Sequence, residues 1–256
     1  MKSHTYRAAI VAVAFGLVGM SPASAADIKV LSAGAFKQVV MALVPGFEKQ
    51  SGHKVTVDNG TAGELKKRIE GGEAFDVAVI TPGVLDEMTA AGKLTAGSKT
   101  ALASVGIGVM VKVGAPKPDI STVDAFKKAV LAAKTVAYID PASGGSSGVY
   151  LEKLFEKMGI ADQVKPKAKL KNGGYVAELI VSGEAELGIH QISEIVPVKE
   201  VVLVGPLPKE IQNSTTYAAG LSASAKDKAA AEAFIKYLSG PDAAAVLKSK
   251  GMDKAS

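Results

Sequence analysis

Three short segments rich in small and hydroxyl-bearing residues are the parts of this sequence best suited to chemistry. They are Ser32–Ala35, Gly60–Gly63 and Ser143–Gly148, and each lies directly before a segment with a helical pattern. The N-terminus of a helix presents unpaired backbone N–H groups and a partial positive charge, and small side chains let an anion approach them. Each segment alone is equally typical of an ordinary turn or helix cap. The three together predict a site for a small anion.

Two titratable side chains near these segments could add proton transfer. His190 ends an apolar, strand-like run, and Lys37 lies in the first turn of the helix predicted after Ser32–Ala35. A positioned base could remove a proton from the carbon next to a carboxylate, with Tyr150 and Tyr175 as further donors. His190 could equally be a hydrogen-bonded strand-end residue or a ligand contact, and Lys37 could be solvated. The residues alone leave these roles open.

Other kinds of active site find little support. Gly144–Gly148, Asp162 and His190 follow the order of a hydrolase triad, but Pro141 and its neighbours separate the serine from the preceding strand. A nucleophile elbow follows its strand directly. The chain has no Cys, which excludes thiolate metal sites, iron–sulfur clusters and cysteine nucleophiles. No spacing of His, Asp and Glu fits a metal site, although Glu194 could contact a cation. We therefore expect neither a metal nor a cofactor.

The three segments must be positioned by a fold in which strands and helices alternate. Short β-rich runs alternate with segments whose apolar residues recur every three or four positions, which indicates an α/β fold with a largely parallel sheet. We expect strands at 28–32, 54–58, 76–80, 105–113, 135–139, 167–171, 186–190, 201–204 and 214–221. We expect helices at 36–50, 62–70, 84–91, 121 onward, 149–158, 175–182 and 224 onward. In such a sheet the three segments lie at the carboxyl ends of strands, where ligands bind.

The length of the chain predicts two α/β lobes. Its 256 residues exceed the common size of a single domain, about 100–150 residues. The first lobe should consist of residues 27–105 and 206–256, and the second lobe should consist of residues 106–205. No linker rich in Pro, Gly or Ser separates them, so strands near Val105 and at 204–214 should form the hinge. The anion would lie between the lobes, and closure would follow binding because only the closed state lets both lobes contact it.

The N-terminal residues have the three parts of a secretory signal peptide. A short positive region precedes the apolar run 8–20, and Ala23-Ser24-Ala25 is a small-residue cleavage pattern. The apolar run is shorter than the roughly 18–20 residues that a membrane span needs. We therefore predict a signal peptide at 1–25, cut after Ala25 or Ala26. The mature protein should be periplasmic and not inserted in the membrane.

The charge balance argues against a nucleic-acid partner. Loss of the signal peptide removes Lys2 and Arg7 and no acidic residue, which lowers the net charge from +5 to +3 and leaves Arg68 as the one Arg. Nucleic-acid-binding surfaces usually combine clustered Arg with aromatic residues, and aromatic residues are only 5% of this chain. The alternating lysines within 165–171 have the period of a strand and should share one solvent-facing strand face. We expect Arg68 to form a surface ion pair.

Several motifs occur in the order and spacing of a known family. They are Ile28–Ala35, Phe47–Val55, Gly60–Leu65, Gly72–Val77, Gly148–Tyr150, Leu187–Ile189 and Tyr237–Pro241. Each motif is weak alone, but together they span nearly the whole chain after the signal peptide and resemble the periplasmic molybdate-binding-like proteins. The resemblance implies the two-lobed α/β fold of type II periplasmic binding proteins, with the ligand cleft between the lobes. It also implies capture of a small anion and its delivery to the membrane permease of an ABC importer. We expect a monomer.

The resemblance also assigns candidate ligand contacts. The residues concerned are Ser32, Gly34, Thr61, Ala62, Ser146, Ser147, Tyr175, His190 and Gln191. Ala62 stands where the family has a serine, and Gln191 stands where its molybdate site uses a tyrosine. Both departures remove hydroxyl donors, so a small organic carboxylate suits these positions at least as well as molybdate does.

An enzyme is the alternative within the same resemblance. A periplasmic aconitate isomerase is built on this solute-binding fold, so a closed cleft of this kind can become an active site. In that case His190 and Lys37 would be the candidate catalytic groups, and the substrate would be a small tricarboxylate. Turnover of trans-aconitate would separate the isomerase from a protein that only captures its ligand.

Overall fold

The computed structural model describes residues 25–255, so the predicted signal peptide lies outside the described residues except for Ala25. The strands are β1 (Asp27–Ala33), β2 (Lys54–Gly60), β3 (Val77–Ile80), β4 (Thr100–Lys112), β5 (Val136–Ile139), β6 (Ala168–Lys171), β7 (Leu187–Gln191), β8 (Val201–Pro206), β9 (Ser214–Leu221) and β10 (Asp253–Lys254). The helices are α1 (Gly34–Ser51), α2 (Ala62–Glu70), α3 (Pro82–Ala90), α4 (Val123–Ala132), α5 (Ser146–Lys157), α6 (Ala161–Val164), α7 (Ala177–Val181), α8 (Ile192–Ile195), α9 (Lys228–Leu238) and α10 (Pro241–Ser249), with short 3₁₀ turns η1 (Pro141–Ser143), η2 (Lys165–Lys167) and η3 (Lys209–Ile211). The alternation of strands and helices follows the hydrophobic pattern, and the α/β prediction is confirmed.

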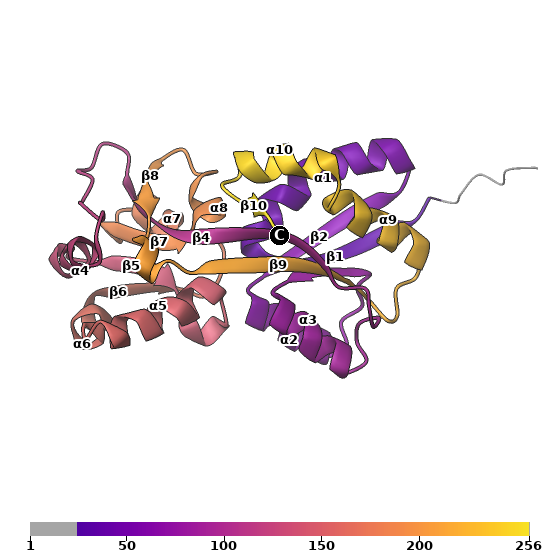
Figure 1. Cartoon of the computed structure of the whole chain (residues 1–256), viewed down its shortest axis with the longest axis horizontal. Helices are drawn as coiled ribbons and strands as arrows, with labels where there is room; N and C mark the ends of the chain where they lie inside the picture. Colours follow the sequence, from indigo (N-terminus) through magenta and orange to yellow (C-terminus); the bar gives the residue numbers. More distant parts are fainter. Residues whose placement is uncertain (1–24, 256) are drawn as a thin grey trace, which may run out of the picture.

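The strands form a curled mixed sheet that runs through two lobes. Its order is β2-β1-β3-β9-β4-β7-β5-β6, and β8 and β10 also pair with β4. The strands β1, β2 and β3 are parallel to one another, and so are β5, β6 and β7. Figure 1 shows one lobe around β1 and β2 and the other around β5 and β6, with the long strands β4 and β9 running between them. Each lobe therefore has its own set of parallel strand ends facing the space between the lobes.

Separate hydrophobic cores hold the two lobes. One core combines buried residues from 28–105 with buried residues from 217–252, and Phe36 and Phe234 are among its largest side chains. Two smaller cores draw only on residues within 107–211. The chain thus crosses from the first lobe to the second and then back, and its C-terminal residues pack in the first core. The residue boundaries 27–105 with 206–256, and 106–205, stay a prediction.

Strand β4 changes partners in its middle. Its first part, Thr100–Gly106, pairs with β9, and its second part, Ile107–Lys112, pairs with β7 and β8. At the change the side chain of Gln212 accepts a hydrogen bond from the Ile107 N–H and donates one to the Ile107 carbonyl, both at 2.9 Å. This amide replaces a neighbouring strand at the point where the backbone passes from one lobe to the other.

Two helices begin later than the sequence pattern predicts. The cap of α4 is Thr122, whose Oγ1 accepts from the Ala125 N–H at 3.1 Å, one residue after the expected Ser121. Helix α9 begins at Lys228 because Asp227 caps it, accepting from the Ala230 N–H at 2.9 Å. The expected start at 224 lies in a turn. The cap is the residue whose side chain accepts a hydrogen bond from a free N–H of the first turn. Several consecutive polar residues can make that contact, so the sequence alone does not identify which one does.

The lysine-rich segment does not form one strand face. Residues 165–167 form the 3₁₀ turn η2, and β6 begins at Ala168 because Pro166 cannot donate to a strand ladder. The Nζ of Lys167 donates to the carbonyls of Val130, Leu131 and Ala133 at 2.9, 2.7 and 2.7 Å. Unpaired carbonyls and partial negative charge at the C-terminus of a helix favour such an ammonium group. Lys167 therefore caps α4 from a distant part of the chain.

Replacing Lys167 with Met should lower the free energy of unfolding by about 1–2 kcal/mol. The substitution keeps most of the side chain but leaves the carbonyls at the end of α4 without their charged donor. The matched control is Lys169→Met, because Lys169 is exposed on β6. Urea denaturation of both variants measures the difference, and equal stabilities would contradict the capping role.

Candidate functional site

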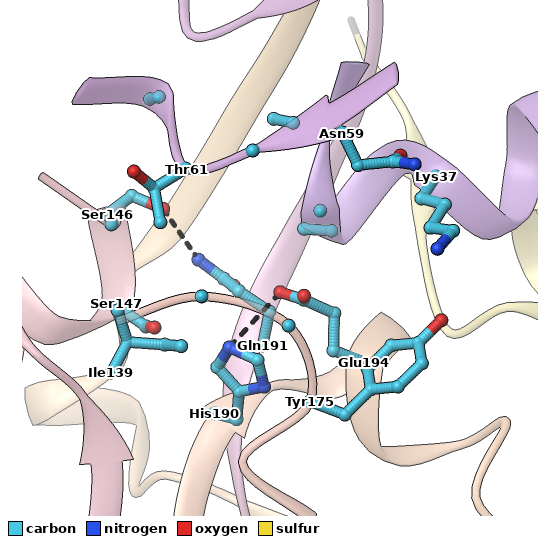
Figure 2. A pocket seen from close by; sticks show the side chains of 18 of the residues that line it. Lys37, Asn59, Thr61, Ile139, Ser146, Ser147, Tyr175, His190, Gln191 and Glu194 are labelled. Carbon is cyan, nitrogen blue, oxygen red and sulfur yellow. Dashed lines mark hydrogen bonds and ion pairs between the residues drawn. The ribbon is translucent and has the colours of Figure 1, made fainter. Parts of the chain in front are cut away.

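A cavity of about 380 Å³ lies between the lobes, at the ends of the strands that the sequence marks (Figure 2). Its walls combine the ends of β2, β5 and β7, the starts of α1, α2 and α5, residues from 173–178 at the start of α7, and single residues of α8 and β9. The polar and charged side chains that line it are Lys37, Asn59, Thr61, Glu64, Ser146, Ser147, Tyr175, Glu178, His190, Gln191, Glu194 and Tyr217. Three helix N-termini therefore face one space, as an anion site requires.

A buried pair of titratable side chains forms one wall of the cavity. His190 is 1% exposed and Glu194 is 6% exposed, and Nε2 of the imidazole lies 3.2 Å from Oε2 of the carboxyl group. Burial raises the pKa of Glu194 to about 8, an effect that the charge of Lys37 opposes, and burial lowers the pKa of His190 to about 3. At neutral pH the carboxyl group is therefore protonated and lies beside a neutral imidazole.

The carboxyl group of Glu194 also faces the N-terminus of α1. A Cβ atom added to Gly34, the first residue of that helix, would lie 2.7 Å from Oε1 of Glu194. Only glycine leaves room for the carboxyl group in this place. Figure 2 shows the Glu194 side chain reaching from α8 toward the centre of the cavity, with Lys37 above it and His190 below. One oxygen of Glu194 contacts the imidazole, and the other lies over the helix start.

Three buried polar atoms lack hydrogen-bond partners among the described residues, and all belong to side chains that line the cavity. They are Oδ1 of Asn59, Nδ1 of His190 and Oε1 of Gln191. The amide Nε2 of Gln191 donates to Ser146 Oγ at 3.1 Å and to Thr215 Oγ1 at 3.0 Å. Buried polar atoms are nearly always satisfied by protein, water or ligand, so this grouping indicates a site built for a polar molecule.

The structure brings most of the residues predicted from the sequence into this cavity. Gly34, Ala62, Ser146, Ser147, Tyr175, His190 and Gln191 all line it, together with Lys37. Ser146 Oγ also lies 3.3 Å from the hydroxyl of Tyr217, and the hydroxyl of Tyr175 accepts a hydrogen bond from Gln38 Nε2. The predicted loops therefore meet, although their contacts with a ligand stay a prediction.

Two predicted contacts have hydroxyl groups engaged elsewhere. Thr61 lines the cavity, but its Oγ1 donates to the carbonyl of Ser143 and accepts from the Glu64 N–H at 3.1 Å. Ser32 is fully buried next to the lining residue Ala33, and its Oγ donates to the Ala33 carbonyl at 3.2 Å. Both hydroxyl hydrogens are thus directed at backbone oxygen atoms.

Five polar residues that line the cavity are not predicted as ligand contacts from the sequence: Asn59, Glu64, Glu178, Glu194 and Tyr217. Glu194 was considered only as a contact for a cation, and Tyr217 was not considered at all. No local pattern marks Glu194, because His190 lies in strand β7 and Glu194 in the helix α8, so the helical spacing of four residues does not apply to this pair. Tyr217 comes from β9, far along the chain, and no local pattern connects it to Ser146.

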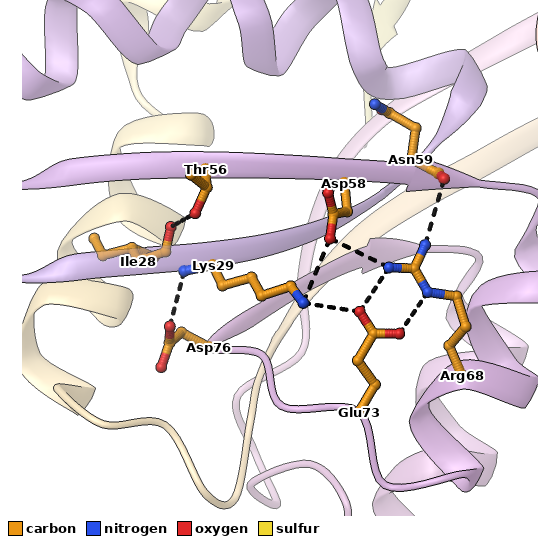
Figure 3. A network of polar contacts seen from close by, with 8 residues as sticks. All are labelled: Ile28, Lys29, Thr56, Asp58, Asn59, Arg68, Glu73 and Asp76. Carbon is orange, nitrogen blue, oxygen red and sulfur yellow. Dashed lines mark hydrogen bonds and ion pairs between the residues drawn. The ribbon is translucent and has the colours of Figure 1, made fainter.

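An ion-pair network outside the cavity fixes the strand that carries Asn59 (Figure 3). Arg68 binds both oxygens of Glu73, with Nε and Nη2 each 2.6 Å from a carboxylate oxygen, and it lies 3.3 Å from Asp58. Its Nη1 also donates to the carbonyl of Asn59 at 3.5 Å. These contacts lower the pKa of Glu73, with Arg68 as the largest cause and Lys29 as the next. As expected, Arg68 takes part in a surface ion pair.

Residues 25–255 hold no candidate metal centre and no candidate membrane-spanning helix. No group of three or more His, Asp or Glu side chains in this part of the chain could hold a metal ion. Within the same residues, no helix combines the length and the apolar character needed to cross a membrane.

The buried pair makes a prediction about stability and pH. Glu194 binds a proton more tightly in the folded protein, with a pKa of about 8, than in the unfolded chain, where it is 4.5. This contribution to stability is complete below pH 4.5 and is lost as pH rises through 8. The pKa of His190 is depressed to about 3 in the folded protein, so its contribution to the free energy of unfolding increases as pH rises to 6.5. Below pH 6.5 this increase offsets the decrease caused by Glu194. Between pH 6.5 and 8 the free energy of unfolding should therefore fall by about 2 kcal/mol.

Denaturation of the wild type and of Glu194→Gln across pH 5 to 9 tests this prediction. The variant lacks the titrating carboxyl group, so the difference between the two proteins isolates its contribution from those of other groups. If the free energy of unfolding changes equally with pH above 6.5 in both proteins, Glu194 is already ionised in the folded state.

Comparisons with known proteins agree with this arrangement. The family model described as bacterial extracellular solute-binding protein matches residues 28–253. An aconitate isomerase from Pseudomonas sp is 33% identical over 229 residues, which are 87% of this chain and 86% of that protein. The molybdate-binding protein ModA of Azotobacter vinelandii is 28% identical over 251 residues, 94% of this chain and 95% of that protein.

Solved structures give the same fold. The periplasmic molybdate-binding protein of Azotobacter vinelandii superposes with a TM-score of 0.76 at 22% identity, covering 90% of this chain and all of that one. The sulfate-binding protein SubI of Mycobacterium tuberculosis H37Rv superposes with a TM-score of 0.71 at 19% identity, covering 89% of this chain and 86% of that one. With a family model matching nearly all of the described residues, the chain belongs to the bacterial extracellular solute-binding proteins and has the two-lobed fold of type II periplasmic binding proteins.

Proposed function

We propose that this protein is exported to the periplasm and binds a small organic polycarboxylate in the cavity between its lobes. The observation that carries the proposal is the meeting of the cation Lys37 and the N-termini of α1, α2 and α5 in one cavity. Lys37 and the three helix N-termini supply positive potential for carboxylate groups. Among the unpartnered buried atoms, Nδ1 of His190 can donate to a ligand oxygen. Oδ1 of Asn59 and Oε1 of Gln191 can only accept from a hydroxyl or a protonated carboxyl group of the ligand.

The dimensions of the cavity favour an organic anion over a tetrahedral oxyanion. Its volume of about 380 Å³ falls in the range of sites for organic ligands, about 300–1,000 Å³. A tetrahedral oxyanion could contact only part of this lining. In addition, Ala62 and Gln191 provide no hydroxyl, and the hydroxyl of Thr61 is directed at Ser143. A ligand with carboxylates several bonds apart can reach Lys37 and the start of α5 at the same time.

Calorimetric titration with trans-aconitate, citrate, molybdate and sulfate tests the binding proposal. We expect the tricarboxylates to bind at least about tenfold more tightly than either oxyanion, which corresponds to about 1.4 kcal/mol. Mass spectrometry of the ligand retained by the native protein provides an independent identification. Molybdate binding tighter than that of both tricarboxylates would overturn the proposal.

In a transport role the loaded protein would deliver its ligand to the membrane permease of an ABC importer. The likeness to molybdate-binding and sulfate-binding proteins supports this role. It requires binding and release with no change to the ligand. The protein would act as a monomer, with no nucleic-acid partner and no metal or cofactor.

A second candidate function is the isomerisation of an unsaturated tricarboxylate, and the buried pair favours it. Capture alone needs no proton donor, yet Glu194 and His190 hold one proton between them inside the cavity. Burial of an acid without a cation in contact costs stability, so its presence is best explained by chemistry. The chain is also 33% identical to an aconitate isomerase.

The reaction would be a shift of one proton along a three-carbon unit. In the fraction of molecules in which Glu194 has lost its proton to solvent, its carboxylate would take a proton from the methylene group of trans-aconitate, beside a neutral His190. The electron pair of that C–H bond would then spread over the allylic carbons and the adjoining carboxylate. Return of the proton to the former vinylic carbon would move the double bond and complete the isomerisation. Proton NMR in D₂O detects both cis-aconitate and deuterium at these carbons, and an unchanged spectrum would exclude this function.

A further inference from the structure

The start of α2 and the turn η1 touch across the mouth of the cavity. The Gly63 N–H donates to the Gly144 carbonyl at 3.2 Å, and Thr61 Oγ1 donates to the carbonyl of Ser143. These residues come from different lobes, because α2 packs in the core that holds β1 and η1 follows β5 of the other lobe. Both contacts join protein to protein, so they need no ligand.

Glycine is required on both sides of this contact. A Cβ atom on Gly63 would lie 2.8 Å from Cα of Gly144 and 2.9 Å from the Ser143 carbonyl oxygen. A Cβ atom on Gly144 would lie 2.7 Å from Cα of Gly63, and the φ of Gly144 is +72°. The obstructing atoms belong to the backbone, so no side-chain rotation could relieve the clash. The two backbones can touch only because neither residue has a side chain.

The contact separates two hollows. The cavity lies on its inner side, and on its outer side a second hollow of about 390 Å³ is lined by Gly63 and Gly144 themselves, with Thr81 and Tyr150. Ala62 and Ser146 line both hollows. The two touching loops are therefore a thin wall between the cavity and the outside.

We propose that Gly63 and Gly144 form a gate: their direct backbone contact holds the lobes closed over the cavity without any contribution from the ligand. The gate stabilises the closed state by a fixed amount that is independent of which ligand is bound. A ligand that contacts both lobes adds its own contribution to the same closed state. Weakening the gate should therefore lower the affinity for every ligand by the same factor.

Gly63→Ala tests the gate, and Gly83→Ala is its matched control. Each glycine is the second residue of a nine-residue helix, α2 for Gly63 and α3 for Gly83, and a Cβ at Gly83 would meet no atom within 4 Å. Alanine favours a helix over glycine, so neither substitution should weaken its own helix. The chain has no Cys, so Lys67→Cys and Lys157→Cys, on exposed positions of α2 and α5, accept one spin label each.

Pulsed electron spin resonance then measures the distance between the two labels. We expect Gly63→Ala to give a longer and broader distance distribution than the wild type, and Gly83→Ala to match the wild type. The affinity for trans-aconitate should fall about tenfold in Gly63→Ala only, with the thermal midpoint of unfolding unchanged. The gate is refuted if Gly63→Ala keeps both the label distances and the affinity of the wild type. Absence of trans-aconitate binding in the wild type would count against the proposed function and leave the distance test intact.

Discussion

Replacing Glu194 with Gln is expected to lower the rate of trans-aconitate isomerisation by roughly 10²–10⁴-fold, the usual contribution of one positioned acid or base. The amide keeps the size of the carboxyl group and can still donate to Nε2 of His190, so the cavity should keep its shape. It cannot accept a proton from carbon. Deuterium exchange into the substrate should fall by the same factor, because exchange and isomerisation share the step in which the C–H bond breaks.

Binding separates this loss from a folding defect. Because Glu194 is neutral in the empty cavity, Glu194→Gln should change the affinity for trans-aconitate by no more than about threefold, or about 0.6 kcal/mol. The control is Glu156→Gln, because Glu156 is exposed on α5 and lies outside the cavity. This variant should isomerise trans-aconitate at the rate of the wild type. Undiminished exchange in Glu194→Gln would remove Glu194 from the chemistry and leave His190 as the candidate base.

The loops of the site could be predicted from the sequence because the rules involved are local. Small residues between a strand and a helix place backbone N–H groups at the edge of a parallel sheet, whatever the rest of the chain does. Ser146, Ser147 and Gly34 were found in this way, and all three line the cavity. The alternation of strands and helices is equally local, since it depends on hydrophobic period alone.

The chemistry of the site could not be predicted in the same way, because it depends on contacts between distant segments. Thr61 reads as a ligand contact in the sequence, but its hydroxyl hydrogen is directed at Ser143, which lies 82 positions away. The sequence offers Glu194 only as a contact for a cation, and the packing of α8 against α1 is what buries it beside Gly34. Its raised pKa follows from that burial and from no feature of the sequence around it.

Replacing Lys37 with Met should weaken the binding of trans-aconitate by about ten- to a hundredfold. Lys37 is the one cationic side chain lining the cavity, and it forms no ion pair with any carboxylate of residues 25–255. A charged hydrogen bond to a carboxylate contributes about 1.5–3 kcal/mol, which corresponds to this range of affinity. Lys49→Met, an exposed position in the last turn of the same helix, is the control and should bind as the wild type does.

The same substitution reports on Glu194 and so shows how Lys37 acts. The charge of Lys37 lowers the pKa of Glu194, so its removal should raise that pKa and keep the carboxyl group neutral to higher pH. Loss of affinity in Lys37→Met therefore cannot come from a new negative charge in the cavity. It must come from the missing cation, and it should grow with the number of carboxylates on the ligand. Titration with trans-aconitate and with its monocarboxylate analogue crotonate measures this dependence. An equal loss for both ligands would mean that Lys37 shapes the cavity and does not bind a particular carboxylate.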